Sequence, residues 1–102
     1  MSTVTDQCKE TLKAHYGPRL AGLWLFGSAA RGEAGSESDL DLLVLLRRPL
    51  DYFEELRTLA DILYPVQLGS DRLISAKPAS VDAFERGETQ LYRNAKRQGK
   101  PL

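Results

Sequence analysis

The pattern of apolar residues predicts a chain in which helices and strands alternate. Apolar residues spaced three or four apart mark one face of a helix, whereas short continuous apolar runs mark buried strands. In chain order we expect a helix over residues 4–16, strands over 20–26 and 40–46, a helix over 51–64, a strand over 66–75, a short helix capped by Ser80 and a last helix over 88–98. Pro65 is expected to end the second long helix.

This order of elements predicts an α/β (α+β) domain with a small three-stranded mixed sheet flanked by helices. The 102 residues correspond to one domain over 1–102, since domains usually hold about 100–150 residues. So small a sheet leaves little room for an enclosed cavity. We therefore expect any site to be an open cleft at one end of the strands.

The composition argues against two classes of binding partner, nucleic acids and membranes. Fourteen basic residues balance fourteen acidic ones, so no net positive field holds nucleic acid or an anionic membrane. No apolar run approaches the roughly 18 residues of a membrane span, and no apolar leader is visible. The single cysteine, Cys8, falls on the apolar face of the first helix and is expected in the core. These features predict a cytoplasmic protein without direct nucleic-acid or membrane contacts.

Charge is distributed unevenly along the chain. Residues 33–61 hold eight acidic and three basic residues, whereas residues 86–100 hold five basic residues and one acidic residue. An acidic middle suits a divalent metal, and a basic tail suits a polyanion or an acidic partner, but the charge counts alone favour two ordinary solvated faces. The candidate docking residues of the tail are Tyr92, Arg93, Lys96 and Arg97.

The segment 27–41, GSAARGEAGSESDLD, carries the chemistry, and its first half predicts a phosphate site. Gly27 lets the backbone approach a ligand without a Cβ clash. Ser28 adds a hydroxyl donor and Arg31 a cationic one. The free N–H groups of a helical turn after the strand would form an anion site that suits a triphosphate.

The second half predicts a metal site. Asp39 and Asp41 are two residues apart at the start of an apolar strand, so their side chains leave the same face of an extended chain. Mg²⁺ takes oxygen ligands from one or two carboxylates and completes its shell with phosphates and water. The arrangement suits nucleotidyl transfer assisted by two ions about 3.5–4 Å apart. The alternative is a pair of aspartates that merely begin a strand at the surface.

Gly-Ser, ten residues and then Asp-x-Asp, with Arg31 and Ser38 in between, resembles the signature of the nucleotidyltransferase superfamily that includes DNA polymerase beta. The short chain resembles the minimal nucleotidyltransferases, which commonly act as antitoxins to helical HEPN-domain ribonuclease toxins. The resemblance implies Mg²⁺-dependent transfer of AMP from ATP. Asp39 and Asp41 would be catalytic metal ligands, with Gly27, Ser28, Arg31 and Ser38 around the nucleotide.

The resemblance also implies a third carboxylate on the neighbouring strand, which would ligate the catalytic metal and help to deprotonate the acceptor. The only acid of the strand expected over 66–75 is Asp71, where many relatives would have an acid nearer position 67, which is Gln67 here. If Asp71 faces the cleft, it completes the catalytic and metal-binding set. If it does not, the chain would bind nucleotide and metal yet transfer poorly.

Three functions remain open from the sequence. The first is an enzyme that adenylylates a partner toxin, in a hetero-oligomer with that partner. The second is a catalytically weak antitoxin of the same fold that acts by binding. The third is one subunit of a small-molecule transferase that modifies an aminoglycoside-type hydroxyl. A domain of this length has little room for an acceptor-binding half, which favours a second polypeptide as the acceptor or its support.

Overall fold

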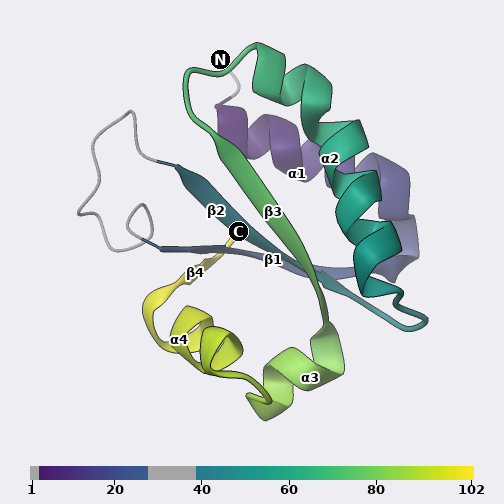
Figure 1. Cartoon of the computed structure of the whole chain (residues 1–102), viewed down its shortest axis with the longest axis vertical. Helices are drawn as coiled ribbons and strands as arrows, with labels where there is room; N and C mark the ends of the chain where they lie inside the picture. The colour runs from purple at the N-terminus through teal and green to yellow at the C-terminus, as the bar shows by residue number, and fades with distance from the viewer. Residues whose placement is uncertain (1–2, 28–38) are drawn as a thin grey trace.

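The computed structural model describes residues 3–27 and 39–102, and in it a mixed sheet is covered by helices (Figure 1). In chain order the elements are α1 (Val4–Tyr16), the 3-10 helix η1 (Gly17–Arg19), β1 (Leu20–Phe26), β2 (Leu40–Leu46), α2 (Tyr52–Leu68), β3 (Ile74–Ser80), α3 (Val81–Arg86), α4 (Gln90–Gln98) and β4 (Lys100–Pro101). The strand order is β3-β2-β1-β4, with β2 parallel to β3 and β1 antiparallel to both of its neighbours. The mixed α/β class is confirmed, with four strands instead of the predicted three.

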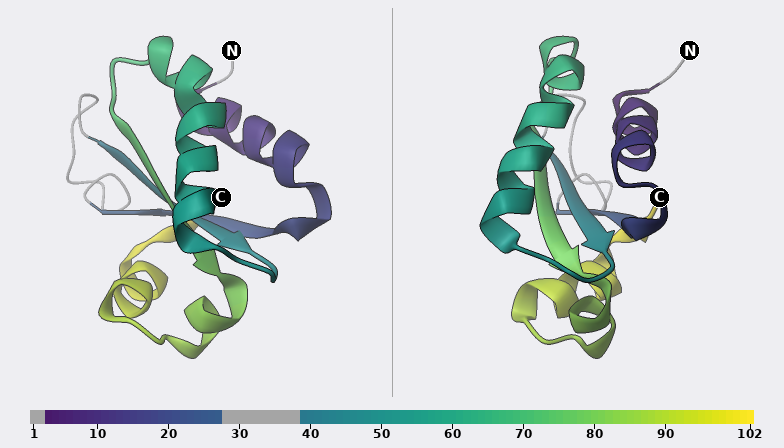
Figure 2. Two further views of the ribbon diagram at one scale, coloured as in Figure 1. Left: turned by 45° about the vertical axis from the view of Figure 1, so that its right-hand side comes forward. Right: turned by 90° about the vertical axis from the view of Figure 1, so that its right-hand side faces the viewer.

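The two faces of the sheet pack against different pairs of helices, as the two views of Figure 2 show. Side chains alternate along a strand, so β2 supplies both faces. The face toward α1 and α2 joins Leu40, Leu42, Val44 and Leu46 to Cys8, Leu12, Leu59 and Leu63. The face toward α3 and α4 joins Leu43 and Leu45 to Ala79, Phe84 and Ala95. Burial on both faces explains the unbroken apolar run of β2.

Helix α1 has the predicted bounds. Thr3 caps it, because its hydroxyl accepts a hydrogen bond from the backbone N–H of Asp6 at 3.0 Å. The apolar face of α1 packs against the core as predicted, and Cys8 is fully buried. Burial raises the pKa of the Cys8 thiol to about 11, which confirms a core role and leaves no reactive thiolate near neutral pH. Among the described helices, none combines the length and the apolar character needed to cross a membrane.

Helix α2 is longer than predicted, and Pro65 lies inside it. A proline there costs a helical hydrogen bond, yet Val66 packs against the core and keeps the last turn in place. Gln67 then ties the end of α2 to the start of β3: its Nε2 donates to the Arg72 carbonyl at 2.8 Å and its Oε1 accepts from the Ile74 N–H at 2.7 Å. The prediction of a strand over 66–75 is therefore wrong, because β3 begins only at Ile74.

The extra strand, β4, is two residues long and extends the sheet beyond β1. It pairs antiparallel with Trp24 and Leu25, and the Leu102 N–H donates to the Leu23 carbonyl at 2.8 Å. The two short helices before it follow the prediction closely. Ser80 caps α3, and the last helix, capped by Thr89, begins at Gln90 instead of residue 88.

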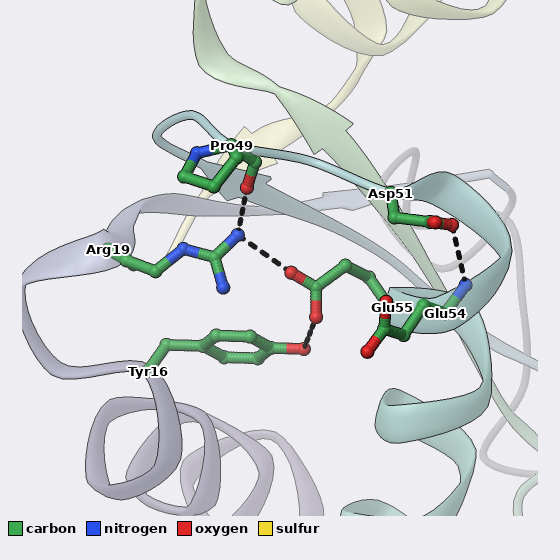
Figure 3. A network of polar contacts seen from close by, with 6 residues as sticks. All are labelled: Tyr16, Arg19, Pro49, Asp51, Glu54 and Glu55. Carbon is green, nitrogen blue, oxygen red and sulfur yellow. Dashed lines mark hydrogen bonds and ion pairs between the residues drawn. The ribbon is translucent and has the colours of Figure 1, made fainter.

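A buried polar network fastens the end of the sheet where β1 begins and β2 ends (Figure 3). Glu55 is 8% exposed, and its carboxylate accepts from Arg19 Nη2 at 2.7 Å and from the Tyr16 hydroxyl at 3.4 Å. The same guanidinium nitrogen donates to the carbonyl of Pro49. This network joins the end of α1, the start of β1, the loop after β2 and the first turn of α2.

Candidate functional site

The predicted metal ligands lie at the opposite end of these strands, where β1 ends and β2 begins. Asp39 immediately precedes β2, and Asp41 pairs with Phe26, the last residue of β1. Asp41 has the same alternation as Leu43 and Leu45, so its side chain lies on the sheet face that carries α3 and α4. The structure therefore brings Asp39, Asp41 and Gly27 to one end of the sheet.

Gly27 and Asp41 make the closest approach at this site. Gly27 has a φ of 78°, a conformation that glycine adopts without penalty. A β-carbon at this position would overlap Oδ2 of Asp41 and lie 3.3 Å from its Cγ. The backbone conformation thus favours glycine, and a side chain here would have to displace the Asp41 carboxylate, beside which the backbone runs.

The electrostatic surroundings of Asp41 favour a nearby cation. Burial raises the pKa of Asp41, and the negative charge of Asp39 raises it further, while the positive charge of Lys77 lowers it. Asp41 is half-buried and Asp39 is exposed. A divalent cation bound between them would relieve both the repulsion and the incomplete solvation.

The neighbouring strand contributes a serine and a lysine, which sequence reasoning missed. In the parallel pairing of β2 and β3, Asp41 is level with Ser75 and Leu43 is level with Lys77. Both β3 residues therefore lie on the sheet face of Asp41. The sequence of β3, ISAKPAS, contains no acid. Lys77 is the only charged residue of this strand, and this signal becomes interpretable once the strand is placed at 74–80.

Asp71 lies outside this set. It is exposed in the segment between α2 and β3, three residues before β3 begins. Across the described parts of the chain, no three histidine, cysteine, aspartate or glutamate side chains gather closely enough to hold a metal ion. The structure thus brings Asp39 and Asp41 together but does not add Asp71 to them. Three further predicted nucleotide-binding residues, Ser28, Arg31 and Ser38, lie outside the described residues.

Helix α4 forms a wall beside the end of β1. A hollow of about 190 Å³ adjoins the site and is lined by Phe26, Gly27, Leu91, Asn94, Ala95 and Gln98. The basic side chains expected to form a docking element hydrogen-bond locally. Arg93 donates to the Gly87 carbonyl, Lys96 to the Glu85 carbonyl and Arg97 to Asn94. The bonds of Arg93 and Lys96 link α4 to α3 and its C-cap, the bond of Arg97 lies within α4, and all three side chains stay exposed.

The oxygen ligands that the described residues offer suit one hard cation. The carboxylates of Asp39 and Asp41 lie beside Gly27, which has no side chain, and they suit a cation that completes its coordination shell with phosphate oxygens, as Mg²⁺ does. A second ion would need further oxygen ligands, and β3 offers only the Ser75 hydroxyl at the level of Asp41. Asp39 and Asp41 are thus the residues that would hold Mg²⁺.

Comparison with known proteins identifies the family of the chain. A curated Methanocaldococcus jannaschii protein, "Putative protein adenylyltransferase MJ0604", is 33% identical over 92 residues, which cover 89% of this chain and 86% of the relative. A chain of the toxin-antitoxin MntA-HpeT in a mutant form superposes with a TM-score of 0.60 at 24% identity, covering 100% of this chain and 72% of that one. A chain of a toxin-antitoxin structure with AMP-PNP gives a TM-score of 0.54 at 26% identity, with coverages of 93% and 69%. Residues 5–93 match the family model for the nucleotidyltransferase domain, and the chain belongs to this family.

Proposed function

We propose that this domain binds ATP with Mg²⁺ and transfers AMP to a hydroxyl group of a partner protein. The observation that carries the proposal is the placement of Asp39 and Asp41 at one sheet end, directly beside the backbone of Gly27. The adenylyltransferase name of the 33% identical relative supports AMP as the transferred group. The toxin-antitoxin structure with AMP-PNP supports an adenine nucleotide as the donor.

In this proposal the chain positions the nucleotide. Asp39 and Asp41 hold the cation, which would neutralise phosphate charge and make the α-phosphorus easier to attack. Gly27 lets the backbone pass directly beside the Asp41 carboxylate, and Ser28, Arg31 and Ser38 bind the triphosphate. The acceptor oxygen forms a bond to the α-phosphorus, the bond to the β-phosphate oxygen breaks, and pyrophosphate leaves. The hydroxyl proton passes to a base near the acceptor or to water.

The shape of the described part of the site supports a protein acceptor. In-line attack needs the acceptor oxygen about 3–3.5 Å from the α-phosphorus and shielded from water. The hollow beside Gly27 is small, at about 190 Å³, and lies between the end of β1 and α4. A docked protein can shield and orient a hydroxyl there. We propose a HEPN-type helical toxin as this partner, in a hetero-oligomer, with the present chain as a cytoplasmic antitoxin.

The test is a mass measurement on the partner. A HEPN-type partner incubated with this chain, ATP and Mg²⁺ should gain about 329 Da, or multiples of it, as expected for AMP transfer. The mass of the present chain should stay unchanged, and the Asp41→Asn variant should leave the partner unmodified.

A second function is favoured by one observation. Among the described residues no third carboxylate joins Asp39 and Asp41, which suits a domain that neutralises its partner by binding alone. A partner that keeps its mass while its toxicity is blocked would support this second function and contradict the transfer.

A further inference from the structure

The feature that the proposed function leaves unused is the charge that β3 presents beside Asp41. Neighbouring strands lie about 4.8 Å apart, so Ser75, level with Asp41, is the β3 residue best placed to share a ligand with it. Lys77 follows two residues later on the same face, level with Leu43. A third carboxylate on the strand next to β2 would occupy one of these two positions. The chain has the hydroxyl group of Ser75 and the ammonium group of Lys77 there instead.

Lys77 is half-buried in a strand that is otherwise apolar or small. Within residues 3–27 and 39–102 its ammonium group has no hydrogen bond and no ion pair within 4 Å. Its charge nevertheless acts on Asp41, where it opposes the effects of burial and of Asp39. The ammonium group is not among the fully buried unpartnered atoms of these residues, so it reaches solvent at the end of a flexible stem and can turn toward an anionic ligand. In the proposed function that ligand is the phosphate chain of the nucleotide.

The charges at this end of the sheet also favour a phosphate contact for Lys77. Asp39 and Asp41 contribute two negative charges, and the phosphate chain of a nucleotide would add more, so the site needs positive charge beyond one divalent cation. Lys77 lies on the sheet face of Asp41, and its charge already acts on that carboxylate. A second divalent cation on this face would be repelled by the lysine, whereas a phosphate oxygen is attracted both to a single ion and to the lysine.

We propose that Lys77 binds a phosphate oxygen of the nucleotide in the place of a second metal ion, so that the domain holds one divalent cation per bound nucleotide. The lysine side chain suits this role, because its flexible stem carries a compact point charge to a phosphate. Lys77 is therefore a nucleotide-positioning residue. This inference rests on the proposed nucleotide site at Asp39 and Asp41.

Metal stoichiometry tests the inference without an activity assay. The full chain is titrated with Mn²⁺ in the presence of saturating AMP-PNP, and free Mn²⁺ is measured by electron paramagnetic resonance. We expect one Mn²⁺ per chain for the wild type. We expect about two for Ser75→Asp, which adds a carboxylate level with Asp41. Two ions on the wild-type chain would overturn the inference while leaving the nucleotide site intact.

Nucleotide affinity provides the second readout. Lys77→Met should weaken Mn²⁺-AMP-PNP binding at least tenfold by calorimetry and keep one Mn²⁺ per chain, whereas Lys77→Arg should weaken it less. Lys13→Met, an exposed lysine of α1, is the matched control and should bind as the wild type does. Lys77→Gln is measured in parallel, and thermal melts identify the variants that fold. Unchanged affinity in a folded Lys77→Met or Lys77→Gln chain overturns the inference. Failure of the wild type to bind Mn²⁺-AMP-PNP at all would overturn the proposed function itself.

Discussion

Gly27 lies so close to Asp41 across the β1–β2 pair that a β-carbon at position 27 would overlap the Asp41 carboxylate. The Gly27→Ala variant should therefore bind Mg²⁺-ATP at least tenfold more weakly, because the new methyl group displaces the Asp41 carboxylate. The positive φ should also cost about 1–2 kcal/mol of the free energy of unfolding. Calorimetric titration and a denaturant melt measure the two effects.

Gly69→Ala is the control for this change. Gly69 has a negative φ of −94°, and a β-carbon there meets only the Val66 carbonyl at 3.8 Å. Its alanine variant should keep both stability and nucleotide affinity. Equal losses in the two variants would mean that the contact with Asp41 has no special role.

Metal and nucleotide binding should be coupled through Asp41. ATP should raise the melting temperature clearly only when Mg²⁺ or Mn²⁺ is present, since a ligand that binds only the folded state stabilises it. Asp41→Asn should fold normally, because the change is nearly isosteric and removes the repulsion with Asp39, but it should lose this metal-dependent stabilisation. Differential scanning fluorimetry with and without EDTA makes the comparison. Equal stabilisation by ATP in excess EDTA would contradict the assignment of Asp39 and Asp41.

Asp71 provides a test of the carboxylate set. Because Asp71 is exposed before β3 begins, Asp71→Ala should leave the affinity for Mg²⁺-ATP, the rate of transfer and the melting temperature within about twofold or 1 °C of wild type, as is usual for an exposed surface substitution. Isothermal titration, the partner mass assay and a thermal melt give the three values. A loss of transfer by orders of magnitude in a folded variant would show instead that Asp71 reaches the site during the reaction.

The network at the other end of the sheet should govern stability alone. Glu55→Gln removes the charge that accepts from Arg19 and leaves the guanidinium with a neutral partner. Because Arg19 is partly exposed, we expect a loss of about 1–3 kcal/mol in the free energy of unfolding rather than the larger cost of a fully buried pair. Nucleotide affinity should not change.

Glu54→Gln is the matched control, since Glu54 is the exposed neighbour of Glu55 in the same turn of α2. Its chemical denaturation curve should overlay that of the wild type. A similar loss for both glutamines would attribute the effect to the charge of the helix N-terminus rather than to the bond with Arg19.

The sequence was sufficient to predict the parts of the fold that depend on local patterns. The strands over 20–26 and 40–46 have continuous apolar runs, and the Asp-x-Asp pair opens the second of them, so the position of Asp39 and Asp41 followed directly. The segment after Pro65 was mispredicted because Val66 and Leu68 suit a strand or a helix equally well. The helix forms in this segment because Val66 packs against the core and Gln67 hydrogen-bonds to the backbone that leads into β3.

The residues opposite Asp41 could not be predicted for a related reason. Which side chains of β3 face the site depends on the register between two strands separated by a helix, and a shift of one residue exchanges the two faces. Only the pairing of Asp41 with Ser75 places Lys77 beside the carboxylates. Likewise, β4 has no apolar pattern of its own and exists only through its pairing with β1.

Strand β1 lies between two charged groups: the Arg19–Glu55 ion pair is at its first residue, and Asp39 and Asp41 are at its last. Seven residues at about 3.3 Å each span roughly 20 Å. At this separation the Coulomb interaction is weak, and because Arg19 and Glu55 form an ion pair whose charges cancel, each group acts little on the other. Cation binding, or a replaced carboxylate, at one end of the strand leaves the ionic anchor at the other end undisturbed, so the chemistry of this domain can change in evolution without loss of its fold.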